Sequence, residues 1–236
     1  MSQDHDVLVF IASYNDEACL HALIREIQTQ DPRYRVLVID DGSETSLDPK
    51  MEDVLFVRLP DNCGLGVCTL VAFDHMLRHG YSAAVRVDAD GQHPVVAIPR
   101  LLEPIWQKKA AIVAGVRTNR GEGTGAGNIV RNAARSYYAV LARLVTRGSA
   151  PKDVNTGFFA VSPRAAETLR DFELDRYPEP EMYILACRSG LSVQEIMVKQ
   201  RPRQQGQSTL GVGGAFRAFL HFNFFLLNEL MGGARR

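Results

Sequence analysis

Residues 85–94 read VRVDADGQHP. The apolar start of this stretch predicts the end of a β-strand, and its glycine and proline predict a tight turn that stops the strand. In an extended backbone, residues two apart point to the same side. Asp88 and Asp90 are therefore expected to present their carboxylates together at the edge of a sheet, with Gln92 as a third oxygen ligand. Such ligands suit Mg²⁺ or Mn²⁺, which bind diphosphates. A solvated turn is the simpler alternative, because turns favour aspartate and glycine.

The rest of the chain alternates strand-like and helix-like segments. Apolar runs predict strands near residues 7–12, 34–39, 54–59, 83–87, 111–116 and 192–198, and a turn entering a strand at 153–161. Helical patterns predict helices up to residue 30 and near 66–79, 98–108, 128–146 and 178–190, with Ser13 or Asn15 capping the first. This alternation and the fully apolar strands predict an α/β fold with a mostly parallel central sheet flanked by helices. Ligands of such sheets bind beyond the carboxyl ends of the strands.

Three of the first four predicted strands end in polar or acidic residues. Residues 13–16 follow the first strand, Asp40 and Asp41 follow the second, and Asp88 and Asp90 follow the fourth. The carboxyl ends of parallel strands meet at one edge of a sheet, so one shared site explains all three clusters. This favours a nucleotide and metal site over a solvated turn.

Composition limits the class of protein. The 236 residues are enough for one large domain or two small ones, and 46% are apolar, which is enough for a full core. Acidic and basic residues both number 27, which argues against a dedicated nucleic-acid binder. The start of the chain is polar, and no run of 18 apolar residues occurs, so a signal peptide and a spanning helix are not expected. These features, with four cysteines expected to be reduced, predict a cytoplasmic protein.

Two other patterns carry less weight. Cys63 and Cys68, followed by His75 and His79, are spaced more tightly than in zinc fingers, and we interpret them as a coincidence. The glycine-rich segment 120–127 lacks the Lys-Ser/Thr of a phosphate-binding P-loop and is typical of a lid or an acceptor-side loop.

Taken in order, a set of motifs resembles the inverting family 2 glycosyltransferases of the GT-A fold. The similar branch contains dolichol- and polyprenyl-phosphate sugar transferases and related bacterial cell-surface glycan enzymes. The resemblance covers roughly residues 6 to 210 and rests on SYND at 13–16, IDDGS at 39–43, NCGLG at 62–66, DADGQHP at 88–94, GVR at 115–117, D…GF at 153–158, YPEPE at 177–181 and RxxGxS at 203–208.

The resemblance implies a role for each matching residue. It implies nucleotide contacts for Ala12, Tyr14, Asp16, Asp40, Asp41, Leu65, Asp88 and Ala89. Asp16 stands where the family usually carries the longer glutamate. The implied ligands of the metal and the diphosphate are Asp88, Asp90 and Gln92. The implied diphosphate or acceptor contacts are Arg117 and Arg131, with Arg203 and Ser208 on a segment that closes over the diphosphate.

The implied reaction is a transfer, dependent on Mg²⁺ or Mn²⁺, from a UDP- or GDP-type sugar donor to a lipid phosphate or a cell-surface glycan. A hydroxyl acceptor needs a general base, for which Glu181 is the first candidate, Glu179 the second and Asp153 the third. A phosphate acceptor is already an anion and needs no base, and Arg117 and Arg131 would then bind it. Both glutamates also suit a purely structural role at a helix start.

Two other functions remain open on the same fold: a non-catalytic nucleotide-sugar-binding subunit or sensor, and a nucleotidyltransferase that would release pyrophosphate. We expect a single catalytic domain at residues 1–212 and an apolar helix at residues 213–236. That helix suits a membrane surface, a homodimer contact or packing on the domain, because apolar periodicity does not separate these three. A membrane contact would place the protein peripherally at the inner face of the cell membrane.

Overall fold

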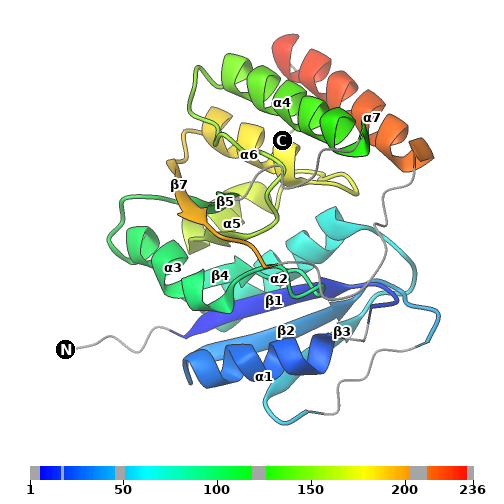
Figure 1. The fold of residues 1–236 in the computed structure, drawn as a ribbon. Helices are drawn as coiled ribbons and strands as arrows, with labels where there is room; N and C mark the ends of the chain where they lie inside the picture. Colours follow the sequence, from blue (N-terminus) through cyan, green and yellow to red (C-terminus); the bar gives the residue numbers. More distant parts are fainter. Residues whose placement is uncertain (1–5, 17–18, 46–50, 119–125, 202–211, 233–236) are drawn as a thin grey trace.

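A seven-stranded sheet runs through the middle of the computed structural model (Figure 1). Residues 6–16, 19–45, 51–118, 126–201 and 212–232 are described, except for the side chains of 126–131, 212, 213 and 215. The strands are β1 (Val7–Ser13), β2 (Tyr34–Asp40), β3 (Val54–Arg58), β4 (Ala83–Arg86), β5 (Ile112–Arg117), β6 (Phe159–Val161) and β7 (Val193–Val198). Their order is β3-β2-β1-β4-β6-β5-β7, and only β6 runs antiparallel to its neighbours. The predicted α/β fold with a mostly parallel sheet is confirmed.

Helices cover both faces of the sheet. They are α1 (Leu20–Gln30), α2 (Leu65–His79), the short 3-10 turn η1 (Val95–Ala97), α3 (Ile98–Trp106), α4 (Ala126–Val145), α5 (Pro163–Leu169), α6 (Glu179–Arg188) and α7 (Val212–Leu230). Apolar residues of α1 and α3 form the core on one face, and those of α2, α5 and α6 form the core on the other. In Figure 1, α4 and α7 lie side by side beyond α6. Within the described parts of the chain, no helix is long and apolar enough to cross a bilayer.

Two elements differ from the sequence-based expectation. Helix α1 begins only at Leu20 and has no side-chain cap, so capping by Ser13 or Asn15 is wrong. Asn15 instead adopts a positive φ of 51° and accepts a hydrogen bond from the Glu44 backbone N–H (2.9 Å), which ties the end of β1 to the end of β2. Helix α5 was not predicted, because its seven residues are too few to show helical periodicity.

The ends of β1, β2 and β4 lie next to one another. In the parallel register Ser13 of β1 is opposite Asp40 of β2. On the other side of β1, the Val87 backbone N–H donates to the Phe10 carbonyl (3.0 Å) and carries the pairing of β4 one residue further. Between β1 and β4 the strand order reverses direction, and crevices of α/β sheets form at such a point.

Two glycines allow backbone segments to approach closely. A Cβ atom on Gly66, in the first turn of α2, would lie 2.3 Å from the carbonyl oxygens of both Leu174 and Asp175. A Cβ atom on Gly157 would lie 3.0 Å from Nη2 of Arg86 and 3.2 Å from a carboxylate oxygen of Asp88. Gly66 therefore brings the segment before α6 against α2, and Gly157 leaves room for the Arg86 side chain.

Arg86 places a positive charge inside the sheet. Its side chain is only 2% exposed, and its guanidinium lies between two carboxylates. Nε and Nη2 donate to Oδ1 of Asp88 at 3.2 and 3.0 Å, and Nη1 donates to Oε1 of Glu179 at 2.7 Å. One buried cation thus joins the end of β4 to the first residue of α6. Removing one partner of a buried ion pair strongly destabilises a fold, because it leaves an uncompensated buried charge.

We expect Arg86→Met to lower the free energy of unfolding by about 3–5 kcal/mol, because it leaves two carboxylates without their buried partner. Urea denaturation measures this change. The matched control is Arg78→Met, which removes a short ion pair to Asp74 (2.6 Å) from an arginine that is 73% exposed. The control should cost less than about 0.5 kcal/mol. Equal effects of the two substitutions would contradict the structural role of Arg86.

Candidate active site

A cavity of about 390 Å³, here called the strand-end cavity, opens beyond β1, β2 and β4. Seven of the eight residues predicted to contact a nucleotide line it: Ala12, Tyr14, Asp16, Asp41, Leu65, Asp88 and Ala89. Asp90 lines it as well. Pockets of 300–1,000 Å³ at a sheet's switch point commonly take a nucleotide-sized ligand.

The remaining residue of that set, Asp40, does not line the cavity. Its side chain is fully buried, accepts a hydrogen bond from the Ser43 N–H (2.9 Å) and pairs with Arg58 at 3.3 Å. Its neighbour Asp41 does face the cavity, and its carboxylate accepts the backbone N–H groups of Cys63 (2.8 Å) and Gly64 (2.9 Å). Asp40 thus shapes the loop after β2, and Asp41 holds the loop that begins α2.

Asp88 and Asp90 stand together on the cavity wall. The side chain of Asp88 is 37% exposed. Burial acts to raise its pKa, but the charge and hydrogen bonds of Arg86, with the charge of Arg117, lower the pKa below its usual value. Asp90 is nearly buried, and its Oδ1 accepts the Gln92 backbone N–H at 3.0 Å. The Gln92 side chain, predicted as a third ligand, is not part of the wall.

These two carboxylates fit a divalent cation that also binds the ligand. No group of three or more His, Cys, Asp or Glu side chains in the described residues could hold a metal by itself. Mg²⁺ in enzymes is typically held by one or two carboxylates, with substrate phosphates and water filling the other positions.

The side chain of His93 holds the turn that carries Asp88 in place. Burial lowers the pKa of this histidine, and its Nδ1 accepts the Asp88 backbone N–H at 3.0 Å, as a neutral imidazole can. The ring stacks on Phe158 with centroids 4.9 Å apart. The turn that carries Asp88 is therefore fixed by a side chain five residues further along the chain.

The structure describes only some of the basic residues that the resemblance implies. Arg117 ends β5; its Nε is buried without a hydrogen-bond partner in the described structure, and its charge acts on Asp88. Arg131 lies in α4, but its side chain falls outside the described part, as do Arg203 and Ser208 entirely. Sequence reasoning missed Arg176, which lines the strand-end cavity and donates from Nη2 to the Asn62 carbonyl at 2.7 Å.

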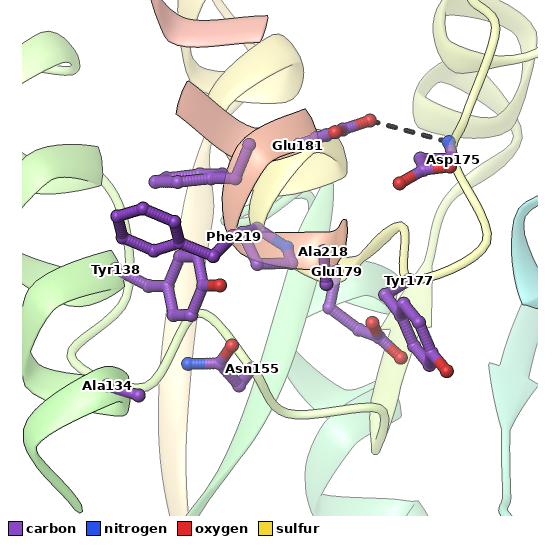
Figure 2. A pocket seen from close by; sticks show the side chains of 11 residues that line it. Ala134, Tyr138, Asn155, Asp175, Tyr177, Glu179, Glu181, Ala218 and Phe219 are labelled. Carbon is purple, nitrogen blue, oxygen red and sulfur yellow. Dashed lines mark hydrogen bonds between the residues drawn. The ribbon is translucent and has the colours of Figure 1, made fainter. Parts of the chain in front are cut away.

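A second cavity of about 370 Å³, the α6 cavity, lies between α4, α6 and α7 (Figure 2). Its apolar wall consists of Ala134 and Tyr138 from α4, Pro180 from α6, and Ala218, Phe219 and Phe222 from α7. Its polar wall consists of Asn155, Asp175, Tyr177, Glu179 and Glu181. Tyr177 also lines the strand-end cavity, so the two cavities share one side chain.

The three predicted candidates for a general base have different surroundings. Glu181 lines the α6 cavity, and burial, together with the charge of Asp175, raises its pKa to about 7. It accepts the Asp175 backbone N–H at 3.4 Å, and Figure 2 shows it directed toward that residue. Glu179 lines the same cavity but is bound by Arg86. Asp153 is buried and lines neither cavity.

Arg86 joins the walls of the two cavities. It lines the strand-end cavity itself and binds Glu179 of the α6 cavity. Asn155 adds a polar group on the α6 side, because its Nδ2 is buried and has no hydrogen-bond partner in the described structure. Two ligands could therefore be held on either side of Tyr177 and Arg86, with a reacting bond between them. The sequence signal for Arg86 was a charged residue inside an apolar strand.

Comparison with known proteins identifies relatives of the chain. It is 28% identical over 220 residues to the polyprenol monophosphomannose synthase of Mycolicibacterium smegmatis, covering 86% of this chain and 80% of that protein. It is also 28% identical over 227 residues to the undecaprenyl-phosphate mannosyltransferase of Micrococcus luteus, covering 88% of each protein.

Among solved structures, the fold is similar to glucosyl-3-phosphoglycerate synthase from Mycobacterium tuberculosis in complex with Mn²⁺, UDP and phosphoglyceric acid. The TM-score is 0.72, at 17% identity, over 94% of this chain and 78% of that one. The fold is therefore GT-A, as the sequence predicted.

The sequence profile of glycosyl transferase family 2 matches residues 8–169, which is more than half of the chain. This match favours glycosyl transfer over the nucleotidyl transfer and the non-catalytic binding that the sequence left open. The chain belongs to glycosyl transferase family 2, and it is a glycosyltransferase.

Proposed function

We propose that the enzyme transfers a sugar from a UDP- or GDP-type donor in the strand-end cavity to a polyprenyl-type lipid phosphate in the α6 cavity, with inversion at the anomeric carbon. The observation that carries this proposal is the junction of the two cavities. Tyr177 lines both, and the 2.7 Å ion pair between Arg86 and Glu179 links their walls. A donor and an acceptor bound on either side would place the reacting bond at that junction.

On the donor side, Asp88 and Asp90 would hold a divalent cation together with the diphosphate. When bound, Mg²⁺ or Mn²⁺ would neutralise the charge that develops on the leaving nucleoside diphosphate. Arg86 keeps Asp88 ionised and fixes its orientation through Oδ1. Ala12, Tyr14 and Asp41 offer the base and ribose a surface at the ends of β1 and β2. The similar structure from Mycobacterium tuberculosis is a complex with Mn²⁺ and UDP, which supports this assignment.

On the acceptor side, three features favour a lipid phosphate. The wall is largely apolar, through Tyr138, Phe219 and Phe222. The charge of Glu179 is offset in part by Arg86, which it shares with Asp88, and a pKa of about 7 lets Glu181 hold a proton near neutral pH. Both effects reduce the repulsion of an anion. The names of the relatives from Mycolicibacterium and Micrococcus point to the same class of acceptor.

A phosphate oxygen is already a nucleophile, so it can attack the anomeric carbon without a general base. The bond to the diphosphate breaks as the bond to the acceptor oxygen forms on the opposite face, which inverts the configuration. Asn155 can donate from Nδ2 to an acceptor oxygen, since that group has no other described partner. A hydroxyl acceptor would instead need Glu181 or Glu179 as a base. A lipid acceptor also agrees with the prediction of a cytoplasmic enzyme at the inner face of the cell membrane.

Mn²⁺ should strengthen binding of UDP or GDP at least about tenfold, and Asp90→Asn should remove this gain, because the variant loses a carboxylate ligand of the cation. Titration calorimetry with each diphosphate, with and without Mn²⁺, measures both effects. Asp74→Asn, on the exposed side of α2, is the matched control and should bind like the wild type. An affinity for UDP or GDP that is the same with and without Mn²⁺ would contradict the donor assignment. A gain with Mn²⁺ that persists in Asp90→Asn would contradict it as well.

Glu181→Gln should stabilise the protein at high pH and not at low pH. The folded-state pKa of Glu181 is raised from 4.5 to about 7, so its contribution to stability is complete below pH 4.5 and is lost as the pH rises through about 7. The variant should therefore gain about 3 kcal/mol over the wild type at about pH 8 and almost nothing near pH 4.5. Denaturant titrations at the two pH values measure this.

The control for that experiment is Glu173→Gln at an exposed glutamate, which should leave the pH dependence unchanged. Glu181→Gln should also keep transfer to a phosphate acceptor within about threefold, because no base is needed. A loss of transfer by two orders of magnitude would instead point to a hydroxyl acceptor.

Phe219→Ala should raise KM for a polyprenyl phosphate by about tenfold and leave the affinity for UDP or GDP unchanged, because it removes apolar surface from the α6 cavity only. Steady-state kinetics with a short-chain polyprenyl phosphate measure KM. Val96→Ala, at an exposed valine that lines neither cavity, is the control. An equal loss of donor affinity would show that the two cavities are not separate subsites.

A further inference from the structure

Helix α7 has a buried side and an exposed side. Phe222 and Leu226 are buried, and the Phe222 ring packs edge-on against Tyr138 of α4, with centroids 4.6 Å apart. The Tyr137 hydroxyl donates to Oδ1 of Asn223 at 2.6 Å. These contacts hold α7 on α4, so packing on the domain accounts for only one side of the helix.

The exposed sides of α7 and of its neighbour α4 are both apolar. We call them together the outer apolar face: Val140 and Leu144 of α4, and Phe216, Leu220, Phe224 and Leu227 of α7. These six side chains are between 38% and 69% exposed. The spacing of four, four and three residues along α7 places its members on one stripe of the helix.

Helical geometry shows that both parts of this face point away from the core. Leu220 and Phe224 stand two residues before and after the buried Phe222, which is about 160° around the helix. Val140 and Leu144 stand in the same relation to Ala142, a fully buried residue of α4. In Figure 1 the two helices lie side by side and form one outer layer of the molecule.

Charge distinguishes this layer from the rest of the protein. The whole chain has 27 acidic and 27 basic residues, whereas α4 has no acidic residue and α7 has only Glu229. Glu229 is 3% exposed and is paired with Arg188 at 2.7 Å. Exposed cations do occur there, as at Arg143 and Arg217. The layer therefore exposes an apolar stripe beside positively charged side chains, and neither helix exposes a carboxylate.

We propose that the outer apolar face docks on an anionic lipid bilayer, with Phe216, Leu220, Phe224 and Leu227 entering the headgroup region. Apolar stripes beside basic residues bind such surfaces through buried area and attraction to anionic lipids. A second copy of the chain fits less well, because a two-fold contact would bring like charges such as Arg217 together.

The docking surface also fits the acceptor cavity, and in this respect it rests on the proposed function. Ala218, Phe219 and Phe222 of α7 line the α6 cavity, while Leu220 and Phe224 of the same helix belong to the outer apolar face. A lipid held by its chain in the bilayer would reach that cavity past a single helix. Docking would thus bring the cavity to its acceptor without removing the lipid from the membrane.

Flotation of the full chain with vesicles tests the docking surface. The wild type should bind vesicles of equal parts phosphatidylglycerol and phosphatidylcholine, and bind phosphatidylcholine alone more weakly. The double substitution Phe224→Ser with Leu227→Ser should lower the affinity at least about tenfold, because two apolar side chains leave the interface. Arg217→Gln should lower it about fivefold, and only on the anionic vesicles.

The matched control is Val96→Ser with Met197→Ser, two exposed apolar residues away from α4 and α7, which should bind vesicles like the wild type. Circular dichroism and thermal unfolding check that each variant is folded. Vesicle binding that is absent in the wild type, or equal in the double variant and the control, overturns the proposal. So does a dimer, seen by sedimentation velocity without lipid, that the double variant converts to a monomer.

A separate assay keeps docking apart from catalysis. Transfer to a water-soluble, short-chain polyprenyl phosphate without vesicles should stay within about twofold in the double variant, since its side chains point away from the cavity. Transfer by a wild type that does not bind vesicles leaves the proposed function standing and rejects docking. Vesicle binding by a wild type that transfers nothing to a lipid phosphate rejects the proposed acceptor and retains the membrane surface.

Discussion

One guanidinium group between two carboxylates organises the active-site region. Arg86 is buried in β4 and bonded on one side to Asp88 and on the other to Glu179. Without that cation the carboxylates of Asp88 and Glu179 would both lose their ionic partner, which is destabilising. Its position depends in turn on Gly157, where a Cβ atom would lie only 3.0 Å from Nη2 of Arg86 and would press on the guanidinium. The geometry of both cavities therefore depends on a residue that occupies a core position in a strand.

Much of the fold and of the strand-end cavity follows from local patterns. Apolar strands alternating with helices specify a parallel sheet, and the geometry of a parallel sheet brings strand ends together. Sequence positions alone could therefore place Asp16, Asp41 and Asp88 around one cavity. The motif resemblance added the family, which the comparisons confirmed over residues 8–169.

The parts that the sequence did not predict depend on contacts between distant segments. Arg86 and Glu179 are 93 positions apart, and no local period connects them. In the sequence Asp40 and Asp41 appear equivalent. In the structure Asp40 pairs with Arg58 of the neighbouring strand and stabilises the loop after β2. The α6 cavity, in which we propose that the acceptor binds, is built by α4, α6 and α7, whose mutual packing is a tertiary property. Hydrophobic periodicity identifies such helices but not which of their faces meet.

Strand β6 has a consequence for how the enzyme assembles. It pairs with β4 on one side and with β5 on the other, so β5 and β7 join the first half of the sheet only through β6. During synthesis all the strands up to β4 emerge before β6, which begins at Phe159. The half of the sheet that borders the strand-end cavity can therefore pair first, whereas β5 and β7 can join it only after β6 has been made.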